Sequence, residues 1–95
     1  MSLTVRAATP RDADALSRLA ALDGRAPLTG RALIAERSGV AIAAAALTSG
    51  SIVADPSYPT ALAVRLLRRR RYQLLRQGGD VGAVAPLLRR LAPSA

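Results

Sequence analysis

The chain has 95 residues, of which 51% are hydrophobic, and it carries a formal net charge of +8 at pH 7. It contains neither Cys nor His, which excludes disulfides, zinc-thiolate sites, thiol nucleophiles and any catalytic group built on an imidazole. A chain this short forms one domain, residues 1–95, with its core expected over about residues 3–77 and a helical tail over 78–95. Because Phe and Trp are absent, the core must use aliphatic side chains, many of them Ala, and a homodimer is expected to enlarge it.

The positive charge is concentrated in the second part of the chain. Residues 1–58 contain six Arg and five acidic residues, a net charge of +1, whereas residues 59–95 contain eight Arg and one acidic residue, a net charge of +7. The longest continuous apolar run, Val40 to Leu47, is far shorter than the roughly 20 residues that span a bilayer, and residues 1–12 lack the apolar stretch of a signal peptide. The sequence therefore predicts a soluble, cytoplasmic protein with one cationic face.

The first predicted elements are a strand over residues 3–8 and a helix that follows it. Thr9 is a suitable N-cap, Pro10 suits the first helical position, and Asp12 places a carboxylate in the first turn, where it favours the helix dipole. Asp23 and Gly24 are expected to end this helix. Its apolar stripe is predicted to consist of Ala13, Leu16, Leu19, Ala20 and Leu22.

A three-stranded antiparallel meander is predicted next. Ser38-Gly39 is a two-residue hairpin signal between two apolar runs, and residues 48–50 supply a second turn before a short strand, Ser51 to Ala54. The run Ala43 to Ala46 alone favours helix, but the flanking turns and β-branched neighbours favour a strand.

A long basic helix is predicted from an N-cap at Thr60 to about Gln77, where Gly78-Gly79 is expected to end it. Its apolar side is expected to contain Leu62, Ala63, Leu66, Leu67 and Leu74. The opposite side contains Arg65, Arg68, Arg69, Tyr72 and Arg76, whereas Arg70 and Arg71 fall on the flanks, where their stems can cover the edge of the core. A short helix can follow Pro86. The expected fold is thus α/β of the α+β two-layer kind.

Three segments of the chain resemble the GNAT-type N-acetyltransferases. Residues 9–23, "TPRDADALSRLAALD", are similar to the "TPxDA"-like start of the first helix in that family, and residues 33–47, "LIAERSGVAIAAAAL", are similar to its "AExDGxxVG"-like hairpin. Residues 53–67, "VADPSYPTALAVRLL", resemble the phrase "VDPEYRGRGIGRALL", whose glycine-spaced turn wraps the pyrophosphate of acetyl-CoA. The resemblance covers about residues 3–77 and implies a truncated, degenerate domain corresponding to the N-terminal half of that fold.

The phosphate turn is where the chain departs from the resembled family. The three glycine positions carry Thr60, Leu62 and Val64, and the Arg or Gln that opens the motif is replaced by Pro59. Pro59 has no N–H to donate, and the side chains of Leu62 and Val64 would project toward the cofactor. We therefore expect no cofactor, with acetyl-CoA bound only if the altered turn still accommodates it.

Catalytic candidates are few. The resemblance implies a strand carboxylate as general base, which makes Glu36 a candidate, with Tyr58 or Tyr72 as an acid. The sequence favours simpler roles for two of these residues: Glu36 as a solvated strand residue near Arg37, and Tyr58 as a packing residue at the turn. The acidic residues do not have metal-ligand spacing, so no metal is expected.

The function predicted from the sequence is a small, non-catalytic interaction domain. It is expected to self-associate, either through the edge strand at residues 51–54 or by packing of the Ala-rich strands, and to bind an acidic partner through Arg65, Arg68, Arg69 and Arg76. A second hypothesis is an acetyl-CoA-dependent acyltransferase, or a subunit of one, with an atypical phosphate loop. A third is non-specific binding of nucleic acid, which the Arg residues allow and the scarcity of aromatic residues disfavours, and a fourth is contact with an anionic membrane surface.

Overall fold

The structure, a computed structural model, describes residues 2–82 and their side chains as far as residue 77. Its elements are β1 (Leu3–Ala7), the short 3-10 helix η1 (Pro10–Asp12), α1 (Ala13–Leu22), β2 (Ala32–Arg37), β3 (Val40–Ala46), β4 (Ile52–Ala54) and α2 (Ala61–Gly82). The strands form one antiparallel sheet in the order β1-β2-β3-β4. The predicted α+β class, the meander and the long basic helix are confirmed. The helix predicted after Pro86 lies outside the described residues.

The first strand joins the meander as an edge strand beside β2. The Ser38 N–H donates to the Ser2 carbonyl at 3.0 Å and the Ala8 N–H donates to the Ala32 carbonyl at 2.9 Å, which brackets the β1–β2 register. In an antiparallel pair, alternate residues direct their N–H and C=O groups toward the partner strand. The even-numbered residues of β1 therefore bond to β2, and the backbone polar groups of Leu3, Val5 and Ala7 point away from the sheet.

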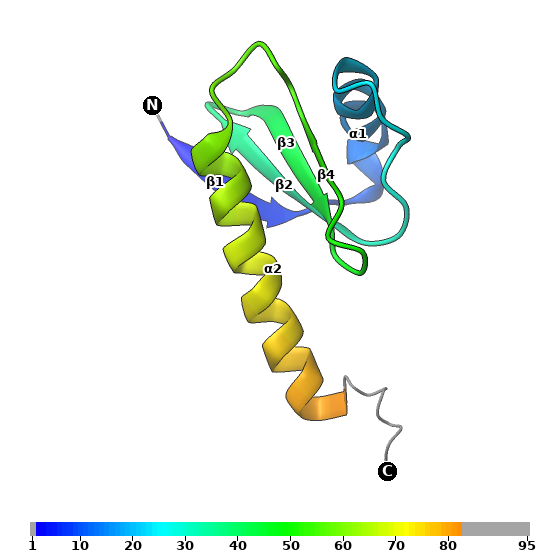
Figure 1. Cartoon of the computed structure of the whole chain (residues 1–95), viewed down its shortest axis with the longest axis vertical. Coiled ribbons are helices and arrows are strands. Elements are labelled where there is room, and N and C mark those ends of the chain that lie inside the picture. Colours follow the sequence, from blue (N-terminus) through cyan, green and yellow to red (C-terminus); the bar gives the residue numbers. More distant parts are fainter. Residues whose placement is uncertain (1, 83–95) are drawn as a thin grey trace.

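The two helices lie on opposite faces of the sheet (Figure 1). Successive side chains of a strand alternate between faces, so Leu33 and Ala35 of β2 pack in the cluster under α2, whereas Ile34 packs in the cluster under α1. The pairing of β2 with β3 shifts between Ala35 and Glu36, and the extra residue, Ile42, lies on the α2 side together with Ala43. This β-bulge adds one large side chain to a face otherwise made mainly of methyl groups.

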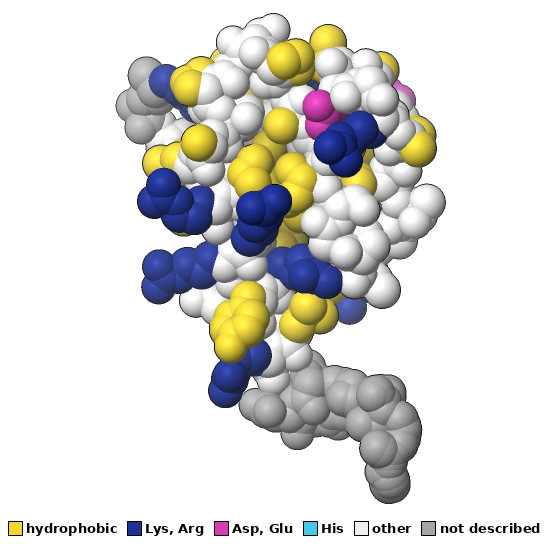
Figure 2. Space-filling model, in the orientation of Figure 1, with side chains coloured by type: hydrophobic (Ala, Val, Ile, Leu, Met, Phe, Trp, Pro, Cys, Tyr) yellow, Lys and Arg dark blue, Asp and Glu magenta, His cyan; other side chains and the backbone are white. Residues whose placement is uncertain are grey.

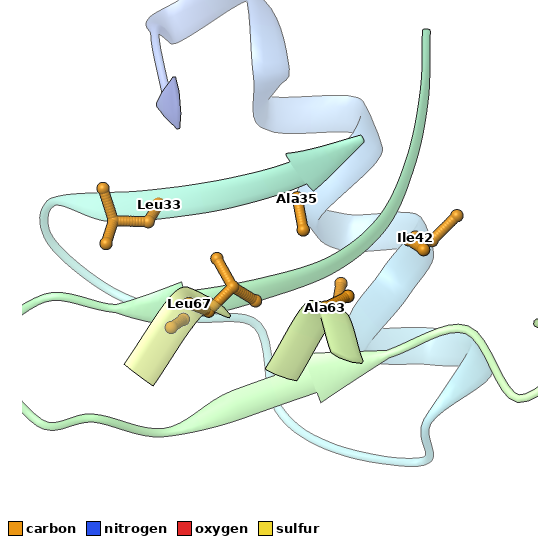
Figure 3. Packing of buried hydrophobic residues seen from close by; sticks show 7 residues of the cluster. Leu33, Ala35, Ile42, Ala63 and Leu67 are labelled. Atoms are coloured by element: carbon orange, nitrogen blue, oxygen red, sulfur yellow. The ribbon is translucent and has the colours of Figure 1, made fainter. Parts of the chain in front are cut away.

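The contact between α2 and the sheet depends on very small side chains. Figure 3 shows Ala63 and Leu67 of α2 facing Leu33, Ala35 and Ile42. Ala63 is 1% exposed and Leu67 is 0% exposed. With Ala on both sides of the interface, the helix backbone can approach the sheet closely, which lets a chain without Phe or Trp exclude water from this face.

The predicted start and end of the first helix are confirmed. Thr9 is the N-cap of η1, which leads directly into α1, and Asp23 is the C-cap, followed by Gly24 at φ +66°. Within the predicted stripe, Leu19 and Ala20 are buried and Leu16 packs against them. Two members of the stripe, Ala13 and Leu22, which lie at the two ends of α1, are exposed instead.

Both predicted turns of the meander are confirmed. Ser38 and Gly39 have φ values of +52° and +83°, the left-handed pair that a two-residue hairpin loop requires. Gly50 adopts φ +79° in the β3–β4 turn. A Cβ atom at Gly50 would lie 3.1 Å from the Cζ atom of Arg71, so this turn passes directly beneath a side chain of α2.

The long helix begins directly after Thr60, as predicted, but differs from the prediction at its C-terminal end and in the exposure of Leu62. It continues through Gly78 and Gly79 to Gly82, because Gly costs a helix only about 1 kcal/mol relative to Ala and does not by itself end it. In the first turn, Leu62 is 52% exposed instead of packing with Ala63 in the core. Its position on the edge of the apolar side leaves it beyond the region that the sheet covers.

The four consecutive Arg residues of α2 do not have equivalent roles. Arg71 is half-buried, and its Nε donates to the Leu47 carbonyl at 2.6 Å while its Nη2 donates to the Thr48 carbonyl at 2.9 Å. These two hydrogen bonds fasten the β3–β4 turn to the helix, as the predicted position of Arg71 at the core edge allows. Arg68, Arg69 and Arg70 are exposed.

Arg71→Met is expected to lower the free energy of unfolding by about 1 to 2 kcal/mol, because a charged donor is lost from two backbone carbonyls while the aliphatic stem is kept. Arg68→Met is the matched control, since Arg68 is exposed on the same helix. Urea unfolding followed by circular dichroism measures both. Equal midpoints for the two variants would show that the contact of Arg71 with the turn contributes nothing to stability.

Candidate functional site

A row of Arg side chains follows the outward side of α2. Arg65, Arg68, Arg69 and Arg76 are all exposed, as is Tyr72 between them. From Arg65 to Arg76 the helix rises about 16 Å. We call these four Arg residues the Arg face. Figure 2 shows Lys/Arg-coloured side chains along α2, with acidic side chains visible only at the far upper corner.

Most of this positive charge has no counter-charge in the part of the chain whose side chains are described. Over residues 2–77, where side chains are described, Arg65, Arg68, Arg69 and Arg70 have no hydrogen bond, ion pair or ring contact. The acidic residues that form ion pairs in this part of the chain do so away from α2. Those pairs are Arg6 with Asp12 and Glu36, Arg18 with Asp55, and Arg25 with Asp23.

The last member of the Arg face interacts with the aromatic residue beside it. The Nη1 atom of Arg76 donates to the Tyr72 hydroxyl at 3.1 Å, and its Cζ atom lies 5.7 Å from the centroid of the Tyr72 ring. The residues are four apart, the spacing at which helix side chains meet. A cation over a ring contributes about 0.5 to 1 kcal/mol at an exposed site. The contact with Tyr72 therefore fixes the position of the Arg76 side chain at the end of the Arg face.

The altered phosphate-turn positions surround the start of α2. The Val64 N–H donates to the Thr60 carbonyl at 2.9 Å, which closes the first turn of the helix. Pro59 and Leu62 line a hollow of about 390 Å³ together with Ser2, Leu3, Arg37, Ile42 and Ala61. The lining is therefore mainly apolar where the resembled family carries a glycine turn, and a Leu side chain stands in the space beside the helix start.

The turn before α2 is held by a buried carboxylate that the sequence identifies only as part of the family motif. Asp55 is 4% exposed; its Oδ1 accepts the Ser57 N–H at 2.8 Å and its Oδ2 lies 3.4 Å from Nη1 of Arg18. Arg18 also donates to the Ala41 carbonyl at 2.8 Å. Asp55 thus joins the turn to α1 and β3. An Asp-Pro pair after a strand indicates such a side-chain-stabilised turn, but no sequence signal identifies Arg18 as its partner.

The two weak catalytic candidates lie on opposite faces of the sheet. Glu36 is on the α1 face, where its Oε2 accepts a hydrogen bond from Arg6 at 3.0 Å. Tyr58 is half-buried and packs against the cluster under α2. The carboxylate and the hydroxyl are therefore not brought together, and Glu36 is engaged by Arg6 instead of being solvated near Arg37.

Asp12, predicted to be a first-turn dipole residue, has a more specific role in the structure. Its two carboxylate oxygens accept hydrogen bonds from the two terminal nitrogens of Arg6, both at 2.8 Å, and Oδ2 also accepts the Thr9 N–H at 2.7 Å. Arg6 thereby bridges Asp12 and Glu36. These hydrogen bonds from Arg6, and next the one from Thr9, hold the pKa of Asp12 well below its usual range, and the same pairs raise the pKa of Arg6.

The free edge of β4, the strand predicted to pair with another chain, is partly occupied. Val53 is in the hydrogen-bonded register with Ala44 of β3, so the backbone groups of Ile52 and Ala54 point outward. The Ala54 N–H donates to Oδ2 of Asp23 at 3.1 Å. Of the two outward N–H groups of this three-residue strand, only that of Ile52 is left to pair with another chain.

The sequence matches no family model, and neither curated proteins nor solved structures match it. Within residues 2–82, no helix combines the length and the apolar character that crossing a bilayer requires. In the same part of the chain, no three residues of the His, Cys, Asp and Glu types come close enough together to hold a metal ion.

The Arg6–Asp12 pair should make stability depend on pH in the acid range. Because the pKa of Asp12 is lowered by folding, its contribution is present above the pKa of the unfolded chain, about 4, and is lost as the pH falls below that value. Asp12→Asn is therefore expected to be less stable than the wild type at pH 7, with the difference shrinking as the pH falls toward 2. Asp14→Asn, at an exposed position two residues on, should follow the wild type throughout. Urea unfolding between pH 7 and pH 2 measures this, and a difference between wild type and Asp12→Asn that stays constant with pH would contradict it.

Proposed function

We propose that the chain is a non-catalytic interaction domain that binds an acidic partner through the Arg face. The observation that carries this proposal is the absence of counter-charges for Arg65, Arg68 and Arg69 within residues 2–77. Basic side chains that repel one another on one side of a helix lower the stability of the free protein slightly, by about 0.2 to 0.5 kcal/mol per like-charged pair. An anionic partner would remove that repulsion on binding.

The scaffold of this domain is proposed to be GNAT-like. The order of elements from β1 to α2 and the antiparallel order of the four strands are the arrangement that the resemblance requires, and they support it. Catalysis on this scaffold is disfavoured by the environment of the two candidates, since Glu36 bonds to Arg6 and Tyr58 packs elsewhere. Cofactor binding is disfavoured by Pro59 and by the Leu62 side chain at the start of α2.

Nucleic acid is the second candidate partner of the Arg face. A row of Arg over about 16 Å of helix can reach several phosphates, each of which adds to the salt dependence of binding. Tyr72 is the one aromatic residue on this face over residues 2–77, and its ring is already in contact with Arg76, so base stacking has little support. An acidic protein segment remains the better match to a surface that offers charge without stacking groups.

Neutralising the Arg face should weaken binding of an acidic probe. We expect Arg65→Gln/Arg68→Gln/Arg69→Gln to lower the affinity for labelled poly-glutamate by about 10-fold or more in low salt, because each ion contact contributes up to about 1 kcal/mol. The matched control, Arg11→Gln/Arg25→Gln/Arg31→Gln, removes the same charge from exposed positions away from α2 and should lose less than about 3-fold. Fluorescence anisotropy measures both.

Three further results would distinguish the candidate functions. Equal losses in the two triple variants would show that net charge, and not the Arg face, determines binding, and would contradict the proposal. Tighter binding of duplex DNA than of poly-glutamate at matched salt would favour the nucleic-acid candidate. Micromolar binding of acetyl-CoA in calorimetry would support the acyltransferase hypothesis and contradict the view that the altered turn excludes the cofactor.

Self-association is proposed on the side of the molecule away from the Arg face. Two copies meeting through α2 would bring Arg side chains together, whereas the region around β4 offers the outward backbone of Ile52 and the exposed side chain of Leu22, the neighbour of Asp23. A second copy there would also extend a core in which Ala provides much of the buried surface.

Leu22→Glu is expected to convert a dimer into a monomer, because it places a charge in the apolar part of the proposed interface. Leu75→Glu is the control, since Leu75 is similarly exposed, 42% against 44%, but lies on α2. Size-exclusion chromatography with light scattering at several protein concentrations gives the mass. A wild-type protein that stays monomeric at high concentration, or a dimer that Leu22→Glu leaves intact, would contradict this interface.

A further inference from the structure

The free edge of β1 differs from that of β4 in being longer and less occupied. The register with β2 directs the backbone N–H and C=O groups of Leu3, Val5 and Ala7 outward. One of these groups, the Ala7 carbonyl, accepts a hydrogen bond from Arg6 at 3.1 Å. Within residues 2–77, the outward groups of Leu3 and Val5 have no hydrogen-bond partner. An open edge of this kind is a template for another extended chain.

Two hollows lie beside this edge, between β1 and α2. The first, of about 390 Å³, is bordered by Leu3 and by Leu62 at the start of α2. The second, of about 290 Å³, is bordered by Val5, Leu66, Arg69, Arg70 and Gln73. Leu3 and Val5 are two residues apart on the same face of β1, a distance of about 7 Å along the strand. The two hollows therefore border successive side chains on the α2-facing side of β1.

The chemistry of the two hollows differs. The first one is lined mainly by apolar residues, Leu3, Ile42, Pro59, Ala61 and Leu62, together with Ser2 and Arg37. The second has an apolar floor, Val5 and Leu66, beside Arg69 and Arg70, which have no partner among residues 2–77. Its charge is complementary to a carboxylate. A strand beside β1 would thus place an apolar side chain in one hollow and an acidic side chain in the next same-face position.

We propose that the β1 edge binds an extended acidic segment of a partner protein, which adds a fifth strand to the sheet. The Leu3 and Val5 backbone groups would provide the hydrogen bonds, and the two hollows would select an apolar side chain followed by an acidic one. This inference makes the proposed function more specific, and it rests on that proposal because the proposal supplies the acidic character of the partner. It assigns that partner an extended conformation and a position that the Arg face alone does not specify.

The test uses a substitution that removes the outward donor of β1 at Val5. Val5→Pro deletes the Val5 N–H, which points away from β2, and edge strands tolerate Pro at such positions. Val5→Ala is the matched control, since it loses more of the side chain but keeps the N–H. The probe, called the Glu-Val peptide, is a fluorescein-labelled peptide of repeated Val-Thr-Glu-Thr, which presents Val and Glu in turn on one face of a strand. A second peptide of equal charge, the Glu-Pro peptide, has Pro at every Val position and cannot form a regular strand ladder. Anisotropy titrations at one salt concentration compare the variants.

We expect Val5→Pro to weaken binding of the Glu-Val peptide by about 10-fold or more, and Val5→Ala by less than about 3-fold, since the N–H and not the side chain is decisive. The Glu-Pro peptide should bind all three proteins equally. Equal binding of the Glu-Val peptide to wild type, Val5→Pro and Val5→Ala would overturn the inference and leave the Arg-face proposal standing. A change from dimer to monomer in Val5→Pro would also overturn it, because the edge would then be a contact between copies of this chain.

Amide exchange of the wild-type protein keeps the inference testable if Val5→Pro does not fold. Slower exchange of the Leu3 and Val5 amides in the presence of the Glu-Val peptide, without a change at Thr4, supports strand addition, because Thr4 already bonds to β2. Unchanged exchange at Leu3 and Val5 under saturating peptide overturns it. The inference is also supported if the Glu-Val peptide protects the Leu3 and Val5 amides of the wild type and does not bind Arg65→Gln/Arg68→Gln/Arg69→Gln. In that case one peptide contacts the β1 edge and the Arg face together.

Discussion

The structure depends on a sheet interior made of methyl groups. Ala35, Ala43, Ala44 and Ala45 are each 0% exposed, and they line both faces of the central strand pair. Side chains this small do not hold helices away from the sheet, so α1 and α2 can cover the two faces closely and exclude water without aromatic residues. The area buried per residue is correspondingly small, which makes each polar anchor between the layers important. Those anchors are Arg71 on one face and Arg6 and Arg18 on the other.

The same constraint explains where the molecule is hollow. Only Leu33, Ile42 and Leu67 supply sizeable fully buried side chains on the α2 face, and they lie under the middle of the contact. Between β1 and α2, the side chains of Leu3, Leu62, Val5 and Leu66 border two hollows instead of filling them. The charges also differ between the two faces: Arg6 of β1 and Arg18 of α1 form ion pairs with carboxylates, whereas Arg65, Arg68 and Arg69 of α2 have none within residues 2–77.

Much of the fold could be predicted from the sequence because its boundaries have local causes. Thr9-Pro10 at the start of α1 and Ser38-Gly39 in the hairpin specify backbone conformations through the residues themselves. The pairing of β1 with β2 could not be predicted in this way, since nothing in residues 3–7 indicates which strand lies beside them. The roles of individual Arg residues were also inaccessible, because Arg71 and Arg70 are neighbours in sequence and only the position of the β3–β4 turn makes one of them structural. The exposed state of the Arg face followed from helical periodicity, and the hollows beside β1 needed the tertiary structure.

The distribution of charge also links stability to binding. In the free molecule, Arg65, Arg68 and Arg69 lie three and four residues apart on one side of α2 and repel one another, an effect of a few tenths of a kcal/mol for each pair. The burial of Ala63 and Leu67 against the sheet offsets this repulsion. A ligand that binds only the folded state stabilises it in proportion to the logarithm of its concentration over its dissociation constant. A polyanion on α2 would therefore both remove the repulsion among these Arg residues and favour the folded state, so that binding at the surface and stability of the fold increase together.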